Sequence, residues 1–159
     1  MIKLYKQTAD GLCYAESWVD DSLATVHTGI VGEIGECYEE DCENAKRYLK
    51  NFKEEYEKQG YHSIPDEKMY WICVKWQTES GKLDNAEEER LNIAYDSLNE
   101  AFGWTGLGYA DGFETSEENG GLYITLYALS VDKELGIETA KTSTELYTDF
   151  TVTAEKFSK

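Results

Sequence analysis

YEEDCENAKRYLKNFKEEYEKQG, residues 38–60, contains the strongest periodic signal in the chain. Its apolar residues recur at steps of three and four, so they share one stripe of an α-helix: Tyr38, Cys42, Ala45, Leu49, Phe52 and Tyr56. Acidic residues crowd its start and basic residues fill its later turns, an order that complements the helix dipole. Gly60 is a typical C-terminal stop. The sequence therefore predicts an amphipathic helix over about residues 38–59, with the acids at 39–43 as a solvated helix start.

Short strand-like runs precede this helix. Asp20-Asp21 separates two of them and is typical of a tight hairpin turn. Gly29, Gly32 and Gly35 follow at a spacing of three, which indicates backbone in unusual conformations. The first part of the chain is thus expected to be an antiparallel sheet plus one long helix, with strands at residues 2–5, 12–19 and 22–28.

The only proline, Pro65, follows the predicted helix and marks the expected domain boundary. The two sides differ in formal net charge, which is -6 for residues 1–65 and -11 for residues 66–159. We therefore expect a β-rich domain over residues 1–64 and a second domain over residues 66–159.

The pattern of residues 66–159 predicts the order strand, helix, strand, strand, helix, strand. Asn85 and Glu88 are spaced as in a capping box, and residues 122–129 alternate as a half-buried strand does. Asp132 is positioned to cap the second helix. The order βαββαβ predicts a ferredoxin-like α+β domain, although the first strand could instead complete the first domain. The expected elements are a strand at 69–77, a helix ending at Gly103, a short strand at 107–114, a loop at 115–121, a strand at 122–129, a helix to about 145 and a closing strand at 147–157.

Composition narrows the class of protein. The chain has 159 residues, a formal net charge of -17 and 13% aromatic residues, which favours a globular protein over a disordered acidic tail. No apolar run approaches the ~20 residues of a membrane span, and the N-terminal residues have no apolar signal core. A surface this negative repels phosphates, which disfavours nucleic acid as a partner. These features favour the cytoplasm.

No catalytic, metal or cofactor motif is found. Cys13, Cys37, Cys42 and Cys73 have irregular spacings and are expected to be reduced thiols rather than zinc ligands. His27 is expected to be a strand residue with a local partner, and His62 a solvated linker residue. Residues 103–112 are glycine-rich, but they follow a helix instead of preceding one, so they predict a helix stop and a connecting loop.

The string Thr28-Gly29-Ile30-Val31-Gly32-Glu33-Ile34-Gly35 follows the predicted hairpin and precedes the predicted helix, which leads into Gly60 and Tyr61. This arrangement resembles a WGR domain, a module found beside poly(ADP-ribose) polymerase catalytic domains and in bacterial proteins. The family pattern is a hairpin, Trp-Gly-Arg-(Ile/Val)-Gly-x-x-Gly, and a helix ending in Lys…Gly-Tyr. Matching positions are Gly29, Val31, Gly32, Gly35, Lys58, Gly60 and Tyr61. Thr28 and Ile30 stand where the family has Trp and Arg, which help that module touch nucleic acid or a neighbouring domain. The resemblance, covering about residues 1–63, implies the fold without the nucleic-acid activity, because isoleucine cannot pair with a phosphate.

The favoured function is an acidic, non-enzymatic binding protein that captures a basic protein, as an inhibitor or immunity-type protein does. Electrostatic steering would speed that encounter, and aromatic residues would supply anchors. The alternatives are a WGR-derived module linked to nucleic acid, kept open by basic residues along the predicted helix, and an unrecognised carboxylate-dependent enzyme. The candidate partner-binding residues are Trp104, Tyr109, Asp111, Phe113, Glu114, Glu117 and Glu118.

Overall fold

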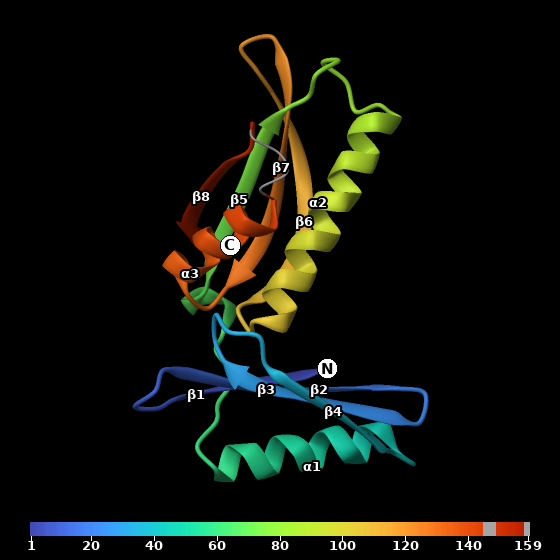
Figure 1. Ribbon diagram of the computed structural model, residues 1–159, viewed down its shortest axis with the longest axis vertical. Coiled ribbons are helices and arrows are strands. Elements are labelled where there is room, and N and C mark those ends of the chain that lie inside the picture. The colour runs from blue at the N-terminus through green and yellow to red at the C-terminus, as the bar shows by residue number, and fades with distance from the viewer. Residues whose placement is uncertain (145–148, 158–159) are drawn as a thin grey trace. The chain divides into compact units, whose positions relative to one another are not determined.

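Two four-stranded antiparallel sheets and three helices make up the computed structural model, which describes residues 1–144 and 149–157 (Figure 1). The protein is therefore α+β. It divides into two units, the first comprising Met1–Ile64 together with Trp104–Gly106. The second comprises Pro65–Gly103 and the chain from Leu107 onward. Among the described residues, no helix is long and apolar enough to cross a bilayer.

The first unit contains a sheet with the strand order β1-β2-β3-β4. The expected hairpin turn is confirmed: β2 pairs with β3 as far as Asp20 and Leu23, and Asp21 in the turn has a φ of 52°. On the outer edge of β1, Tyr5 forms an isolated bridge with His62. The strands are β1 (Ile2–Gln7), β2 (Leu12–Asp20), β3 (Leu23–Ile30) and β4 (Glu36–Asp41).

The helix α1 (Ala45–Lys58) is shorter than expected, and the predicted start near Tyr38 is wrong. Residues 36–41 form β4 instead, because each of them pairs with a residue of β3. The helix begins where Asn44 caps it, with its side-chain oxygen accepting a hydrogen bond from the backbone N–H of Arg47 at 2.9 Å. The predicted stop is close to correct, since Gly60 has a φ of +91°.

The core of the first unit lies between α1 and one face of the sheet (Figure 1). Phe52 is buried against Ala15 and Val26, and its ring centroid lies 4.5 Å from that of Tyr56. Burying a phenylalanine side chain contributes about 2–3 kcal/mol. Since α1 supplies the apolar cover for this face, the opposite face depends on other interactions.

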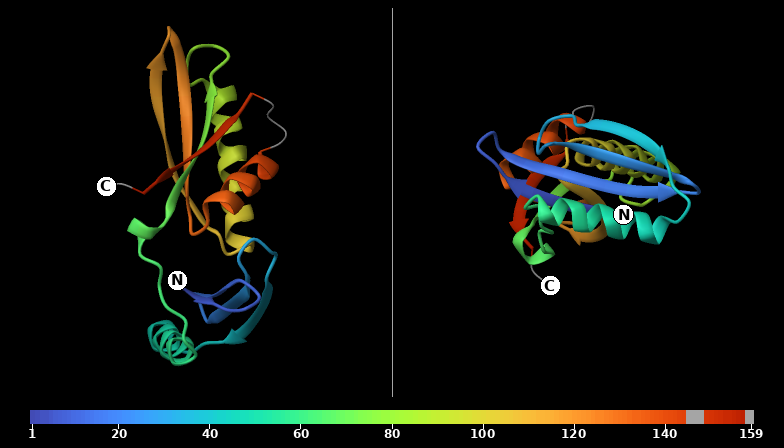
Figure 2. Two further views of the ribbon diagram at one scale, coloured as in Figure 1. Left: turned by 90° about the vertical axis from the view of Figure 1, so that its left-hand side faces the viewer. Right: turned by 90° about the horizontal axis from the view of Figure 1, so that it is seen from below.

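The second unit has the predicted order of elements, and its sheet has the strand order β6-β7-β5-β8. Both helices lie against the same face of this sheet (Figure 2). The predicted alternation of faces in residues 122–129 is confirmed, with Ile124, Leu126 and Ala128 buried on one face, although Thr125 and Leu129 on the other face are buried as well. Asp132 caps the last helix as expected, accepting from Leu135 N at 2.9 Å. The elements are β5 (Tyr70–Gln77), α2 (Asn85–Trp104), β6 (Gly108–Glu118), β7 (Gly121–Ser130), α3 (Lys133–Ser143) and β8 (Thr151–Lys156).

Three boundaries in this unit differ from the expectations. The predicted loop at 115–121 is wrong, because β6 continues to Glu118 and turns at Asn119-Gly120. The cap of α2 is Asp84 rather than Asn85, with the Asp84 carboxylate accepting from Glu87 N. The closing strand begins at Thr151, and the expected start at Tyr147 lies outside the described residues.

A buried carboxylate anchors α2 to β5. Glu87 accepts a hydrogen bond from the indole N–H of Trp76 at 3.1 Å and one from the backbone N–H of Glu79 at 2.9 Å. The Trp76 ring stacks on Phe150 with centroids 4.4 Å apart, and Arg90 lies over both rings. This cluster joins β5, α2 and the chain that leads into β8.

Glu87→Ala is expected to destabilise the second unit by about 2–4 kcal/mol, because the buried indole N–H of Trp76 and the part-buried backbone N–H of Glu79 lose their acceptor. Glu88→Ala is the matched control, since Glu88 is exposed and one residue away, and its change should stay within about 0.5 kcal/mol. Chemical denaturation followed by tryptophan fluorescence measures both. Equal denaturation midpoints for the two variants would contradict the anchoring role.

Candidate functional site

The face of the first sheet opposite α1 carries a row of polar side chains. Strand register places Lys3, Glu16, His27 and Cys37 side by side on β1, β2, β3 and β4. Side chains alternate between the faces of a sheet, so this row lies on the face that α1 leaves uncovered. We call these four residues the polar row.

The buried part of the row is a continuous hydrogen-bonded chain. Lys3 Nζ lies 3.1 Å from Glu16 Oε2, and Glu16 Oε1 accepts from His27 Nδ1 at 2.8 Å. His27 Nε2 lies 2.9 Å from Tyr14 Oη. Burial lowers the pKa of Lys3, an effect that the Glu16 charge opposes. The predicted reading of His27 as a strand residue with a local partner is confirmed.

Three glycines enclose the Tyr14 ring. A Cβ on Gly106 would lie 2.1 Å from Tyr14 Cδ1, and one on Gly35 would lie 2.0 Å from Tyr14 Oη. A Cβ on Gly29 would lie farther away, at 3.0 Å from Tyr14 Cε1. The predicted cause of the glycine spacing was unusual backbone, and this holds for Gly32 with its φ of 94°, whereas Gly29 and Gly35 serve close packing. The enclosed phenol has a raised pKa, mainly through burial and then through the Glu16 charge.

Residues 104–106 complete this face of the first unit. Tyr14 Oη donates to the carbonyl of Trp104 at 3.2 Å, and the Gly35 N–H donates to the same carbonyl. Tyr5 Oη donates to the carbonyl of Gly106 at 3.1 Å. The Trp104 indole meets the His27 ring edge-on, with centroids 5.1 Å apart, yet 47% of Trp104 stays exposed.

A hollow of about 450 Å³ opens beside the polar row. We call it the acidic hollow, because its walls combine two indoles with three carboxylates. None of the carboxylates forms an ion pair with a residue in the described part of the chain. The hollow is lined by Trp18, Asp20, Asp21, Ser22, Leu23, Thr25, Cys37, Glu39 and Trp104.

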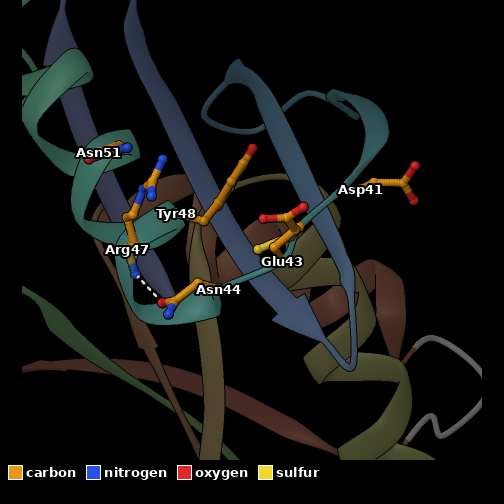
Figure 3. Close-up of a pocket in the computed structure, with 7 residues that line it drawn as sticks. Asp41, Glu43, Asn44, Arg47, Tyr48 and Asn51 are labelled. Atoms are coloured by element: carbon orange, nitrogen blue, oxygen red, sulfur yellow. Dashed lines mark hydrogen bonds between the residues drawn. The ribbon is translucent and has the colours of Figure 1, made fainter.

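A smaller hollow of about 210 Å³ borders the first turns of α1 (Figure 3). Asp41, Arg47 and Tyr48 line it together with the residues around the helix cap. The Tyr48 hydroxyl donates to Glu40 on β4. Burial raises the pKa of Tyr48, and the hydrogen bond to Glu40 raises it further. The strand β4 therefore has one hollow beside its polar-row face and another where it leads into α1.

The candidate residues from the sequence fall into two places. Trp104 lines the acidic hollow. The other six lie on β6 in the second unit, where Tyr109 and Phe113 are exposed. Glu114 accepts from the Tyr127 hydroxyl, and Glu118 pairs with Lys75 at 2.5 Å. Strand register puts Glu114 and Glu118 on one face of the sheet and Phe113 on the other, with Asp111 at a bulge.

Sequence reasoning did not group the residues of the acidic hollow. A usable signal was present, since the turn acids Asp20 and Asp21 stand next to Trp18 in a hairpin whose register follows from the turn. The sequence pattern predicts Glu39 at the start of the helix, whereas the structure places it on β4. Trp104 enters only through contacts that no local pattern specifies.

Comparisons with protein-family models, with curated proteins and with solved structures gave no match. Within the described residues, no group of three or more histidine, cysteine or carboxylate side chains is placed to hold a metal ion.

Gly106→Ala is expected to cost about 3 kcal/mol, because the new methyl collides with Tyr14 at a backbone φ of +67° that alanine disfavours. Gly103→Ala is the control: a Cβ there meets nothing within 4 Å. As a helical glycine-to-alanine change, it should be neutral or stabilising by up to about 1 kcal/mol. Thermal unfolding followed by circular dichroism compares them, and equal melting temperatures would refute the enclosure of Tyr14.

Cys37 should react with iodoacetamide at pH 8 much faster than Cys73. Cys37 is exposed, whereas burial, aided by the Glu155 charge, raises the pKa of the Cys73 thiol to about 11. Thiolate is the reactive form, so the pKa shift alone slows Cys73 roughly 100-fold. Mass spectrometry of timed samples measures both rates, with urea-unfolded protein as the reference. Equal rates in the folded protein would contradict the assigned burial.

Proposed function

We propose that this protein is a non-enzymatic binding protein that captures a basic protein partner, as an inhibitor or immunity-type protein does. The observation that carries the proposal is the acidic hollow, in which three carboxylates that have no cationic partner among residues 1–144 and 149–157 stand beside two indoles. A lysine or arginine side chain suits such a site, because carboxylates attract its charge and indole faces bind cations.

The charge of the whole chain supports the same function. A net charge of -17 accelerates encounter with a positive surface, and local contacts then determine how long the complex lasts. The hydrogen-bonded chain that runs from the polar row to Tyr14 supports binding rather than catalysis, because the Tyr14 phenol is enclosed by glycines and donates to a backbone carbonyl. Trp104 lies against His27 and reaches solvent, which suits an anchor for a partner.

The fold assignments made from the sequence remain part of the proposal. For a degenerate WGR-like first unit, the support is the succession of a sheet, a glycine segment and a helix that ends before Gly60 and Tyr61. For a ferredoxin-like second unit, the support is the strand order β6-β7-β5-β8 with both helices on one face (Figure 2). Nucleic acid is a weaker alternative, since Lys50 and Lys53 on α1 pair with glutamates one turn later.

The test removes the three charges of the hollow with Asp20→Asn, Asp21→Asn and Glu39→Gln in one variant. Asparagine tolerates the positive φ of residue 21. The control variant Glu89→Gln, Asp96→Asn and Glu100→Gln makes the same change in net charge on the exposed surface of α2. Association of each with octa-arginine is measured by stopped flow, and capture from an extract of the source cell identifies the partner.

The hollow variant should associate with octa-arginine about tenfold more slowly than the wild type, and the α2 variant less than threefold more slowly. Capture should yield a basic protein with the wild type and the α2 variant, and lose it with the hollow variant. If both variants behave alike, the acidity acts as a diffuse field and the proposed site is wrong. Salt-sensitive binding of a DNA duplex by the wild type would favour the nucleic-acid alternative.

A further inference from the structure

The strand β4 ends the first sheet with an open edge. It hydrogen-bonds with β3 on one side, and no described residue pairs with its other side. All six of its residues are exposed. The opposite edge of the sheet is partly closed, because Tyr5 on β1 exchanges two backbone hydrogen bonds with His62 at 2.8 and 2.9 Å.

The pairing pattern identifies which backbone groups of β4 face outward. Cys42 N donates to Ser22 O at 2.7 Å at the end of the ladder. Bonded and non-bonded pairs alternate in antiparallel sheets, so Glu40, Tyr38 and Glu36 bond to β3. The N–H and C=O groups of Cys37, Glu39 and Asp41 therefore point to the open edge. An added strand would find three regularly spaced donors and acceptors there.

Charge selects the kind of strand that can pair there. Four of the six residues of β4 are acidic and none is basic, so a second copy of β4 would bring like charges together, as protected edges do. A cationic strand has the opposite charge and is attracted. The edges of the other sheet differ from β4. The edge strand β8 carries one glutamate and one lysine. The edge strand β6 is also acidic, but it has a bulge at Asp111 and side-chain bonds from α2 to Ala110, and its Glu114 and Glu118 already have partners on β7 and β5.

A second observation concerns Thr25 on β3, which lines the acidic hollow. Thr25 lies opposite Glu39, lines the hollow and is only 7% exposed. Its hydroxyl makes no hydrogen bond with any other residue that the structure describes. A threonine hydroxyl can accept hydrogen bonds, and the side chain of an arginine inserted into the hollow would supply donors for it.

We infer that the basic partner binds as an extended segment that adds a fifth strand along β4, with every second side chain an arginine or lysine directed at the acidic hollow. This inference rests on the proposed function and specifies its binding mode. Main-chain hydrogen bonds to residues 37, 39 and 41 supply affinity, as in other strand additions. The hollow contacts every second side chain of the added strand and so supplies specificity. Its residues Glu39, Thr25 and Trp18 lie in one row across β4, β3 and β2.

The experiment uses the full chain and an eight-residue peptide that alternates arginine with threonine or valine. The control peptide has the same arginines, but two of its other residues are proline. Glu39→Gln removes one charge, while Glu39→Pro also removes an outward N–H donor without removing a bond to β3. Edge positions of this kind accept proline. Isothermal titration measures the affinity of each protein for each peptide, and circular dichroism checks that both variants are folded.

The alternating peptide should bind the wild type at least tenfold more tightly than the proline peptide, because proline cannot donate to the ladder. Glu39→Gln should weaken binding about threefold and Glu39→Pro at least tenfold. Independently of whether Glu39→Pro folds, exchange of the amides of residues 37, 39 and 41 in the wild type should slow about tenfold with the alternating peptide.

Equal binding of both peptides, with unchanged amide exchange in β4, would overturn strand addition while leaving capture of a basic partner intact. Equal loss of affinity in the two Glu39 variants would do the same. Absence of salt-sensitive binding by either peptide would instead remove the proposed function itself. Formation of a dimer that Glu39→Pro abolishes, seen by native mass spectrometry, would assign the edge to a second copy of the chain and overturn the inference.

Discussion

The hydrogen-bonded chain from Lys3 through Glu16 and His27 to Tyr14 is the constraint on which the first unit depends. A buried carboxylate or imidazole without partners costs several kcal/mol, and here both nitrogens of His27 are satisfied from neighbouring positions on one face. Because this face is polar, the apolar cover from α1 lies on the other side. The Tyr14 ring at the end of this chain leaves no room for a side chain at two neighbouring positions, which accounts for Gly35 and Gly106.

Local chemistry made much of the fold predictable. The Asp20-Asp21 turn, the cap at Asp132 and the alternation of residues 122–129 each depend on neighbours in sequence, and each is confirmed. The start of α1 could not be read in the same way. Tyr38 and Cys42 fit a helical stripe, but pairing of residues 36–41 with β3 outweighs that local preference. Acidic residues suit a helix start and an exposed edge strand equally well, so their charge did not discriminate.

The candidate site shows the same limit more strongly. Sequence reasoning placed it at residues 104–118 because aromatic and acidic residues are close together there, yet only Trp104 lines the acidic hollow. On a strand, neighbouring residues face opposite ways, so Phe113 and Glu114 cannot share a surface. The residues that do share a surface come from two hairpins and from residue 104. Their grouping depends on strand register and on the contact of Tyr14 with the Trp104 carbonyl.

The excess of acids has a cost in the free protein, since like charges repel one another and lower the stability of the compact state. Where carboxylates pair with bases, as Glu16 does with Lys3, this cost is offset within the chain. Asp20, Asp21 and Glu39 have no such offset in the part of the chain that the structure describes. On the proposed function, a cationic partner removes this repulsion when it binds, so the charge that weakens the free protein adds to the affinity of the complex. Binding then also stabilises the fold, because a ligand that prefers the folded state shifts the unfolding equilibrium toward it.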